Sequence, residues 1–178
     1  MSSLVVTLIG PDRPGLVRAV SDKAIEHGAN WSDSLMANFA GQFAGIVHLQ
    51  VAADKSLALQ HALRALDSDA LRILVTLADD LPPAPRARRI RLELIGHDRP
   101  GIIRSISTRL ANQGVSIDKM KTHIASGAMS GEQMFHLDAQ LTAPQELDTD
   151  LLREDLESLA NELMVDITFD SGADTLPG

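Results

Sequence analysis

The chain has 178 residues, a formal net charge of −8 and 44% hydrophobic residues. These are the proportions of a folded globular protein, so wholesale disorder is not expected. The chain contains no cysteine, which excludes disulfides, a thiol nucleophile and a cysteine-ligated metal. The acidic balance argues against a protein that grips nucleic-acid phosphates by itself.

Charged residues interrupt the first part of the chain, so it does not read as a signal peptide. No apolar run approaches the ~18 residues that a membrane span needs. We therefore expect a cytoplasmic protein that has no membrane partner.

The first half of the chain alternates between strand and helix patterns. Leu4–Ile9 is a short apolar run rich in β-branched residues, which predicts a buried strand. Apolar residues at helical spacing then predict a helix that starts at Pro14 and ends at Gly28, with Asp12 or Arg13 in the N-cap region. The other elements predicted in this half are strands over residues 31–39, 43–51 and 70–77 and a helix over residues 56–66.

The second half repeats the first. From Leu8–Gly28 to Leu94–Gly114, 10 of 21 positions are identical, and further on His48 aligns with His136 after a two-residue insertion. Such internal repetition indicates two homologous domains. The elements predicted in this half are strands near 91–95, 115–125, 132–141 and 164–169, helices near 100–113 and 147–162, and a small-residue hairpin turn over 125–131.

The order in each half is βαββαβ, which predicts an α+β protein with two tandem ferredoxin-like domains. Each would have an antiparallel four-stranded sheet with both helices on one face. We expect domains over residues 1–81 and 91–170, a Pro/Arg-rich linker over 82–90 and a flexible tail over 171–178. A basic cluster follows the prolines of this linker and comprises Arg86, Arg88, Arg89 and Arg91. It is either a contact site for an anion or a partner, or part of a solvated linker.

The most informative motif is Gly-x-Asp-Arg-Pro-Gly, which stands between the first strand and the first helix of each copy. Glycine lets a ligand approach the backbone closely, and the first N–H groups of a helix attract a carboxylate. Asp12 and Asp98 are placed to accept hydrogen bonds from an ammonium group. The motif is therefore complementary to a zwitterionic amino acid, although a plain helix start with a capping aspartate is the other interpretation.

Units of this size and strand order that carry this box resemble ACT domains, and the resemblance covers residues 3–170 in two copies. ACT domains are ligand-sensing modules that typically bind amino acids and regulate an enzyme or a transcription factor. They often pair side by side, with sites between the first loop and a partner domain. The implied ligand-binding residues are Gly10, Asp12, Arg13, Pro14, Gly15, Leu16 and Asn30 in the first copy, and Gly96, Asp98, Arg99, Pro100, Gly101, Ile102 and Ser116 in the second.

Other functions find less support in the sequence. The six histidines form no His-Glu-x-x-His pattern, and a shared metal site of His97, His123 and His136 is conceivable. An RNA-binding sheet needs aromatic side chains for stacking, but the chain has one Trp, four Phe and no Tyr. The acidic helix Asp148–Glu162 would either dock a basic partner or present a solvated face. We expect no catalytic residue, cofactor or resident metal.

A tandem of this length without an attached enzyme is similar to the glycine cleavage system transcriptional repressor group. The resemblance implies a non-catalytic regulator that binds a small amino acid, with glycine as the first candidate. Its partner would be a transcription factor, bound through protein contact and without direct nucleic-acid binding. The two copies would pair either within one chain or across a homodimer. The alternative is a protein-interaction scaffold with vestigial ligand sites.

Overall fold

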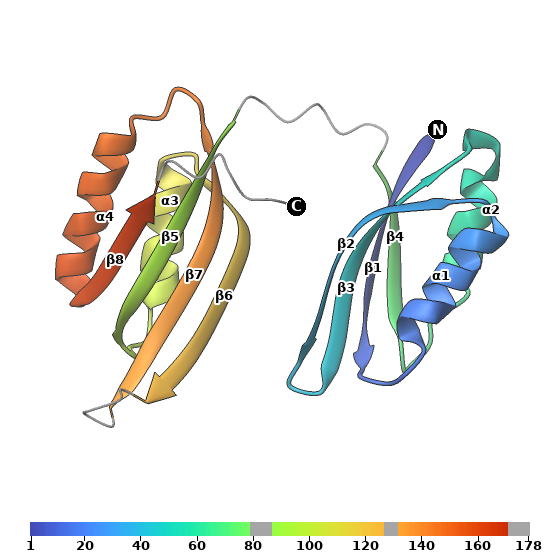
Figure 1. Ribbon diagram of the computed structural model, residues 1–178, viewed down its shortest axis with the longest axis horizontal. Coiled ribbons are helices and arrows are strands. Elements are labelled where there is room, and N and C mark those ends of the chain that lie inside the picture. Colours follow the sequence, from blue (N-terminus) through green and yellow to red (C-terminus); the bar gives the residue numbers. More distant parts are fainter. Residues whose placement is uncertain (79–86, 127–131, 171–178) are drawn as a thin grey trace. The chain divides into compact units, whose positions relative to one another are not determined.

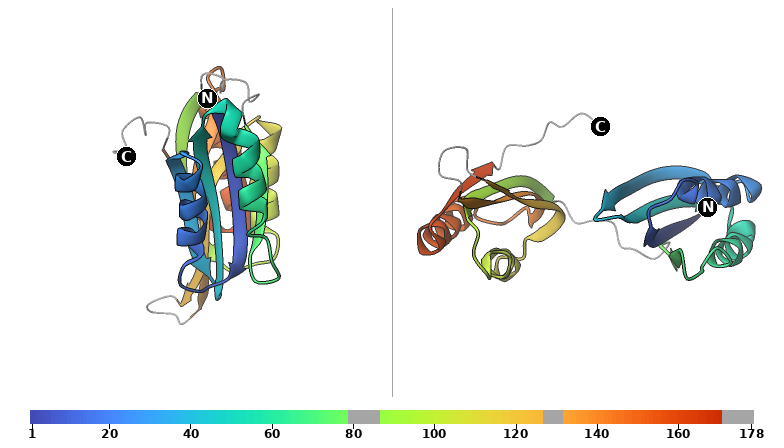
Figure 2. Two further views of the ribbon diagram at one scale, coloured as in Figure 1. Left: turned by 90° about the vertical axis from the view of Figure 1, so that its right-hand side faces the viewer. Right: turned by 90° about the horizontal axis from the view of Figure 1, so that it is seen from below.

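The computed structural model describes residues 1–78, 87–126 and 132–170. The chain divides into two compact units, Met1–Pro82 and Pro83–Gly178. Each unit has one four-stranded antiparallel sheet with two helices on one of its faces, as the ribbon views show (Figure 1 and Figure 2). The predicted fold class, two tandem ferredoxin-like βαββαβ domains, is confirmed.

Unit 1 contains six elements in the predicted order. They are β1 (Ser2–Pro11), α1 (Leu16–Glu26), β2 (Asn30–Phe39), β3 (Gln42–Val51), α2 (Ala53–Arg64) and β4 (Arg72–Leu77). The spatial order of the strands is β2-β3-β1-β4, so β2 is one edge of the sheet and β1 lies inside it. Ala40 and Gly41 join β2 to β3 with positive φ angles of 51° and 78°, the conformation that tight hairpins favour.

The core of unit 1 follows from the alternation along its strands. Leu4, Val6 and Leu8 of β1 are buried against the helices, whereas the residues between them face the other way. The helices turn their apolar sides toward this face, which is why α1 buries Leu16 and Val20. The sheet therefore has an inner face that the helices cover and an outer face that none of the described elements of the unit covers.

Unit 2 repeats this plan. Its elements are β5 (Ala87–His97), α3 (Ile102–Asn112), β6 (Ser116–Ser126), β7 (Gln133–Pro144), α4 (Thr149–Leu163) and β8 (Val165–Asp170). The strand order is β6-β7-β5-β8. Asp148 caps α4, because its carboxylate accepts hydrogen bonds from the backbone N–H groups of Asp150 and Leu151 at 3.0 and 3.3 Å.

Strand β5 begins earlier than the sequence predicts. Ala87 already pairs with Pro144, and Arg88 and Arg89 continue the ladder along β7. Arg88 and Arg89 are therefore strand residues, as the sequence predicts for Arg91, because the longer β7 offers them backbone partners. Arg86, the proline run before it, the tail from residue 171 and most of the predicted 125–131 turn lie outside the described residues.

The strand register corrects one feature of the internal alignment. His48 lies opposite Val5, and the matching position opposite Arg91 holds Gln140 instead of His136. The connection between β6 and β7 is longer than the two-residue turn of unit 1, which shifts all later positions. His48 and His136 are therefore not equivalent, and their shared place in the sequence alignment was wrong.

Candidate functional site

Each repeated loop leads into a helix that begins at a glycine. Gly15 and Gly101 are the N-cap residues of α1 and α3, with φ angles of 95° and 97°. Among the described residues no side chain caps either helix, so the prediction that Asp12 or Arg13 lies at the cap is wrong. The reason is steric: only glycine readily adopts this left-handed conformation, and it moves the helix start two residues beyond the position predicted for Pro14.

The first glycine of each box has a packing role. A Cβ atom on Gly10 would lie 2.4 Å from the backbone oxygen of Ala70, and one on Gly96 would lie 2.3 Å from Cγ1 of Val165. Both glycines are buried in extended strand and pass close to the segment that leads into or begins the neighbouring strand. The tight contact with the protein itself explains these glycines, so close approach of a ligand is not needed to account for them.

The rest of the box lies at the surface of unit 1. Asp12, Arg13 and Pro14 are exposed, and Leu16 turns inward into the core with 4% of its surface accessible. The Asp12 backbone N–H donates to the carbonyl of Gly41 at 2.9 Å, which ties the loop to the β2–β3 hairpin. The exposed loop is therefore held in position by the hairpin.

Asn38, at the end of β2, is a contributor that the sequence reasoning missed. Its side-chain amide Nδ2 donates a hydrogen bond to Oδ2 of Asp12. The two residues are 26 positions apart in the chain, and only the sheet register brings them together. The Asp12 carboxylate is therefore oriented from one side by an amide, with its second oxygen available for a further donor.

The loop of unit 2 has the same backbone attachment as that of unit 1, but its aspartate has a different side-chain neighbour. Asp98, Arg99 and Pro100 are exposed, and Ile102 is buried in the core. The backbone N–H of Asp98 donates to the carbonyl of Gln133 at 3.1 Å, in the same manner as in unit 1. Ile124 occupies the strand position that corresponds to Asn38, since each lies opposite the phenylalanine that pairs with the first glycine of the box. An isoleucine offers no hydrogen bond to Asp98.

A hollow of about 370 Å³ lies beside the loop of unit 2. Gly96 and His97 line it from β5, and Asn161, Met164 and Asp166 line it from the end of α4 and from β8. Nδ1 of His97 lies 3.5 Å from the carboxylate of Glu132. The second loop thus borders a hollow that also contains polar side chains from α4 and β8.

Asn30 and Ser116 lie far from the loops of their own units. Asn30 starts β2, whereas Asn38 beside Asp12 ends it, so at ~3.3 Å per residue the separation is about 25 Å. Ser116 likewise starts β6, and the Asp98 loop is attached at Gln133, opposite the end of that strand. Within one unit, the structure does not bring the predicted loop residues together with Asn30 or Ser116.

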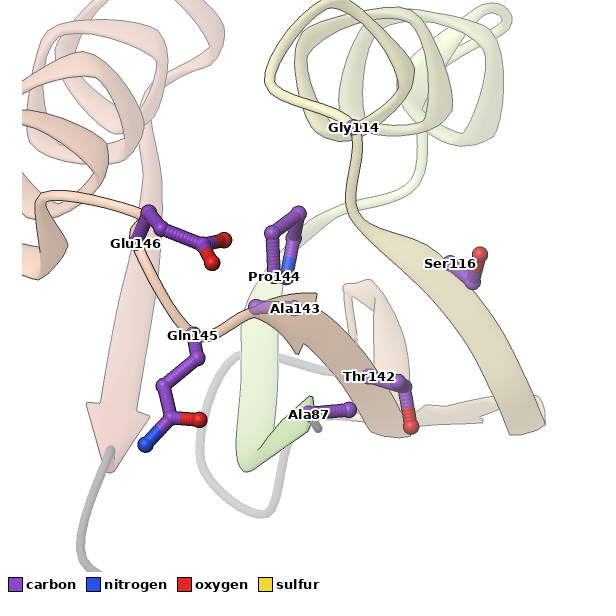
Figure 3. A pocket seen from close by; sticks show the side chains of 8 residues that line it. All are labelled: Ala87, Gly114, Ser116, Thr142, Ala143, Pro144, Gln145 and Glu146. Carbon is purple, nitrogen blue, oxygen red and sulfur yellow. The ribbon is translucent and has the colours of Figure 1, made fainter. Parts of the chain in front are cut away.

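Ser116 instead lines a separate hollow of about 430 Å³ (Figure 3). Its other walls come from the start of β5 and the connection between β7 and α4, and the Glu146 carboxylate points toward Pro144. In unit 1 this connection is almost absent, because β3 ends at Val51 and α2 begins at Ala53. The hollow is therefore a product of the longer connection in unit 2. Its lining residues are Ala87, Gly114, Ser116, Thr142, Ala143, Pro144, Gln145 and Glu146.

The histidines of unit 2 do not form a metal centre by themselves. The rings of His123 and His136 stack with centroids 4.6 Å apart. In the described ranges, no group of three or more histidine, aspartate or glutamate side chains is arranged to hold a metal ion. Within these same ranges, none of the helices is long and apolar enough to cross a membrane.

The family model of the ACT domain matches residues 2–76, the whole βαββαβ set of unit 1 except the last residue of β4. Unit 1 is therefore similar to an ACT domain over almost its whole length. Unit 2 repeats its topology and its glycine-capped loop, so the chain has the fold of two ACT domains in tandem.

Solved structures agree with the tandem ACT fold. An unknown protein from Galdieria sulphuraria superposes with a TM-score of 0.82 at 28% identity, covering 95% of this chain and 97% of that chain. A protein proposed to be a glycine cleavage system transcriptional repressor superposes with a TM-score of 0.69 at 18% identity, covering 95% of this chain and 96% of that one. The second likeness shows the fold alone. No curated protein matches the chain.

Proposed function

We propose that this chain is a non-catalytic regulatory protein that senses a small amino acid at the loops of residues 10–16 and 96–102. The observation that carries the proposal is the same in both loops. An exposed aspartate precedes a helix whose first turn is capped by no side chain of the described ranges. An amino acid carries the two charges that such a loop can satisfy.

In the proposed complex, the ligand carboxylate accepts hydrogen bonds from the first backbone N–H groups of α1, those of Leu16, Val17 and Arg18. These groups have no partner within a helix, and the helix dipole favours negative charge there. The ammonium group donates to Asp12, whose carboxylate Asn38 already orients. The arrangement in unit 2 uses Ile102 and the residues after it together with Asp98.

Glycine is the first candidate ligand, and a transcription factor is the first candidate partner. The support is the similarity of unit 1 to an ACT domain and the fold shared with a protein proposed to repress the glycine cleavage system. The net charge of −8 favours regulation through protein contact over direct binding to nucleic acid. Regulation requires the ligand to bind two states of the protein with different affinity. A cytoplasmic location stays a prediction from the sequence.

Asn30 and Ser116 take a secondary place in this proposal. Each starts an edge strand, about 25 Å or more from the loop of its own unit. They contribute to a ligand site only if another loop approaches that end of the edge strand. The core of the proposed site is therefore the loop itself.

A scaffold with vestigial ligand sites is the second candidate function. The hydrogen bond from Asn38 favours it, because this bond gives Asp12 a structural task that needs no ligand. The absence of such a bond at Asp98 speaks against a purely structural task for the second aspartate within the part of unit 2 that the structure describes.

Isothermal titration with glycine and then with the other amino acids tests the proposal. We expect wild-type protein to bind the amino acid at both loops. The single variants Asp12→Ala and Asp98→Ala should each lose binding at one loop, and the double variant should show no heat of binding. Asp54→Ala is the matched control, because Asp54 is an exposed first-turn carboxylate of α2 outside both loops. Absence of binding by folded wild-type protein to all twenty amino acids would favour the scaffold.

A further inference from the structure

The outer face of the unit 1 sheet carries an apolar row that crosses all four strands. Leu35 of β2 lies opposite Ile46 of β3, Ile46 lies opposite Thr7 of β1, and Thr7 lies opposite Leu74 of β4. The exposed fractions of Leu35, Ile46 and Leu74 are 53%, 49% and 65%. Ile9 stands beside this row with 47% of its surface exposed. We call these five residues, which are aliphatic except for Thr7, the apolar row.

The same positions of unit 2 are polar. Lys121 lies opposite Asp138, Asp138 opposite Glu93, and Glu93 opposite Thr168. Arg91 contacts both carboxylates of this row, Asp138 at 3.0 Å and Glu93 at 2.9 Å. The Asp138 hydrogen bond and charge raise the pKa of Arg91. One fold thus presents a charged row in one unit and an apolar row in the other.

This contrast shows that the fold does not require aliphatic side chains on its outer face. Contiguous apolar side chains on a protein surface mark interaction sites. The apolar row also borders a hollow of about 320 Å³, which Leu35, Ile46, His48 and Asp33 help to line. His48 is held in place by hydrogen bonds with Ser3 and, at 3.0 Å, with Ser32. The outer face therefore offers a concave site, with His48 fixed in its wall, into which a side chain of a partner can pack.

Two charges flank the apolar row at diagonally opposite corners. Asp33 is on edge strand β2, in line with His48, and Arg72 is on the other edge strand, β4, in line with Ile9. Arg72 is 68% exposed and lies 3.6 Å from Asp67, so its guanidinium can take a further acceptor. The backbone N–H of Ser34 donates to Oδ1 of Asp33 at 2.7 Å, and Oδ2 of Asp33 can accept from a partner.

The positions of these charges make the face complementary to itself. The corners are three strands apart at ~4.8 Å each and four residues apart at ~3.4 Å each, so the patch is nearly square. If a twofold axis along the other diagonal of the patch relates two copies, Asp33 of each copy lies over Arg72 of the other copy. Strands of the two copies then cross near 90°, which is one of the two favoured angles for sheet packing.

We propose that the outer face of unit 1 is a homodimer surface, on which the same face of a second copy packs with crossed strands. In this dimer, each Asp33 meets Arg72 of the second copy, and the two apolar rows bury each other. The charged row of unit 2 is unsuited as the occupant, because burying charges against aliphatic side chains without partners is costly. The inference is independent of ligand binding at the loops.

Sedimentation velocity of the full chain tests the proposal. We expect wild-type protein to dimerise at micromolar concentration and the variant Leu35→Lys/Ile46→Asp to sediment as a monomer. The two substitutions copy Lys121 and Asp138, which the fold already accepts at these positions. Leu57→Lys is the matched control, since Leu57 is 64% exposed on α2, away from the sheet, and its dimer should be unchanged.

Charge exchange tests the orientation of the two copies. Asp33→Lys and Arg72→Asp each place like charges at both corners, and we expect each to weaken dimerisation about tenfold. An equal mixture of the two single variants, and the double variant alone, should recover most of the wild-type affinity. A monomeric wild-type protein, or a dimer that survives Leu35→Lys/Ile46→Asp, overturns the surface. A double variant no tighter than the single variants overturns the crossed geometry.

Discussion

Asn38 donates a hydrogen bond from its side-chain amide to the carboxylate of Asp12 and thereby joins the end of β2 to the loop before α1. The corresponding residues of unit 2, Ile124 and Asp98, cannot form this bond. The two loops share their sequence motif and their glycine-capped helix start, but they differ in what orients the aspartate. The proposed ligand sites are therefore unequal.

Removing this hydrogen bond should affect the first loop alone. Asn38→Ile copies Ile124 of unit 2, and we expect it to weaken amino-acid binding in unit 1 and to destabilise that unit by about 1 kcal/mol. Titration calorimetry and urea unfolding measure the two effects. Ile124→Asn is the reciprocal variant, and a gain of affinity there would strengthen the assignment. Unchanged binding in Asn38→Ile would separate Asp12 from ligand recognition.

The buried glycines of the two boxes should respond differently to a second substitution. Gly10→Ala and Gly96→Ala each create a severe contact, and we expect each to destabilise its unit by about 1–3 kcal/mol. The atom nearest the added Cβ is a backbone oxygen of Ala70 in the first case and a side-chain carbon of Val165 in the second.

Trimming can relieve part of the contact at Gly96 alone, because Val165→Ala removes Cγ1 at 2.3 Å and leaves Cβ at 2.8 Å. Gly96→Ala combined with Val165→Ala should cost less than the sum of the two single changes, whereas Ala70→Gly should not rescue Gly10→Ala. Double-mutant cycles by chemical denaturation measure the coupling. Rescue of Gly10→Ala by Ala70→Gly would contradict the assignment of the contact to the backbone.

The N-cap glycines should be sensitive to any side chain, although they have space around them. No atom lies within 4 Å of a Cβ built on Gly15, so the cost of Gly15→Ala comes from its φ angle of 95°. We expect a loss of about 1–2 kcal/mol in thermal unfolding. Gly15→Asn should lose less, because asparagine tolerates left-handed conformations better. Equal losses for both would point to a clash instead of backbone strain.

The cap of α4 provides a test of ordinary helix physics in unit 2. Asp148→Ala removes the acceptor for two first-turn N–H groups and should cost about 0.5–2 kcal/mol in urea unfolding. Asp150→Ala, which leaves both of these hydrogen bonds in place, is the control. A loss confined to Asp150→Ala would contradict the capping role.

The sequence was enough to predict the order of elements in both halves. Alternation in Leu4–Ile9 and helical spacing around Val20 are local signals, and the repeated box shows that the halves share one fold. The family resemblance added the position of the loops. These features depend on neighbours in the chain, which is why they are readable without a structure.

Features that depend on register could not be read in this way. The length of the β6–β7 connection decides that His136 is not the counterpart of His48, and the pairing of β2 with β3 decides that Asn38 reaches Asp12. The family resemblance groups Asn30 with the loop, but β1 and β2 run in the same direction, which puts Asn30 at the opposite end of the sheet. Each case requires pairing between residues distant in sequence.

The central claim is that the two loops bind an amino acid, and a thermal-shift screen against all twenty amino acids tests it most directly. A ligand at 100 times its Kd stabilises the folded protein by about 2.7 kcal/mol, which raises the melting temperature measurably. We expect a selective rise with glycine or another small amino acid, and its loss in Asp12→Ala/Asp98→Ala. No rise with any amino acid, in protein shown to be folded, would contradict the claim.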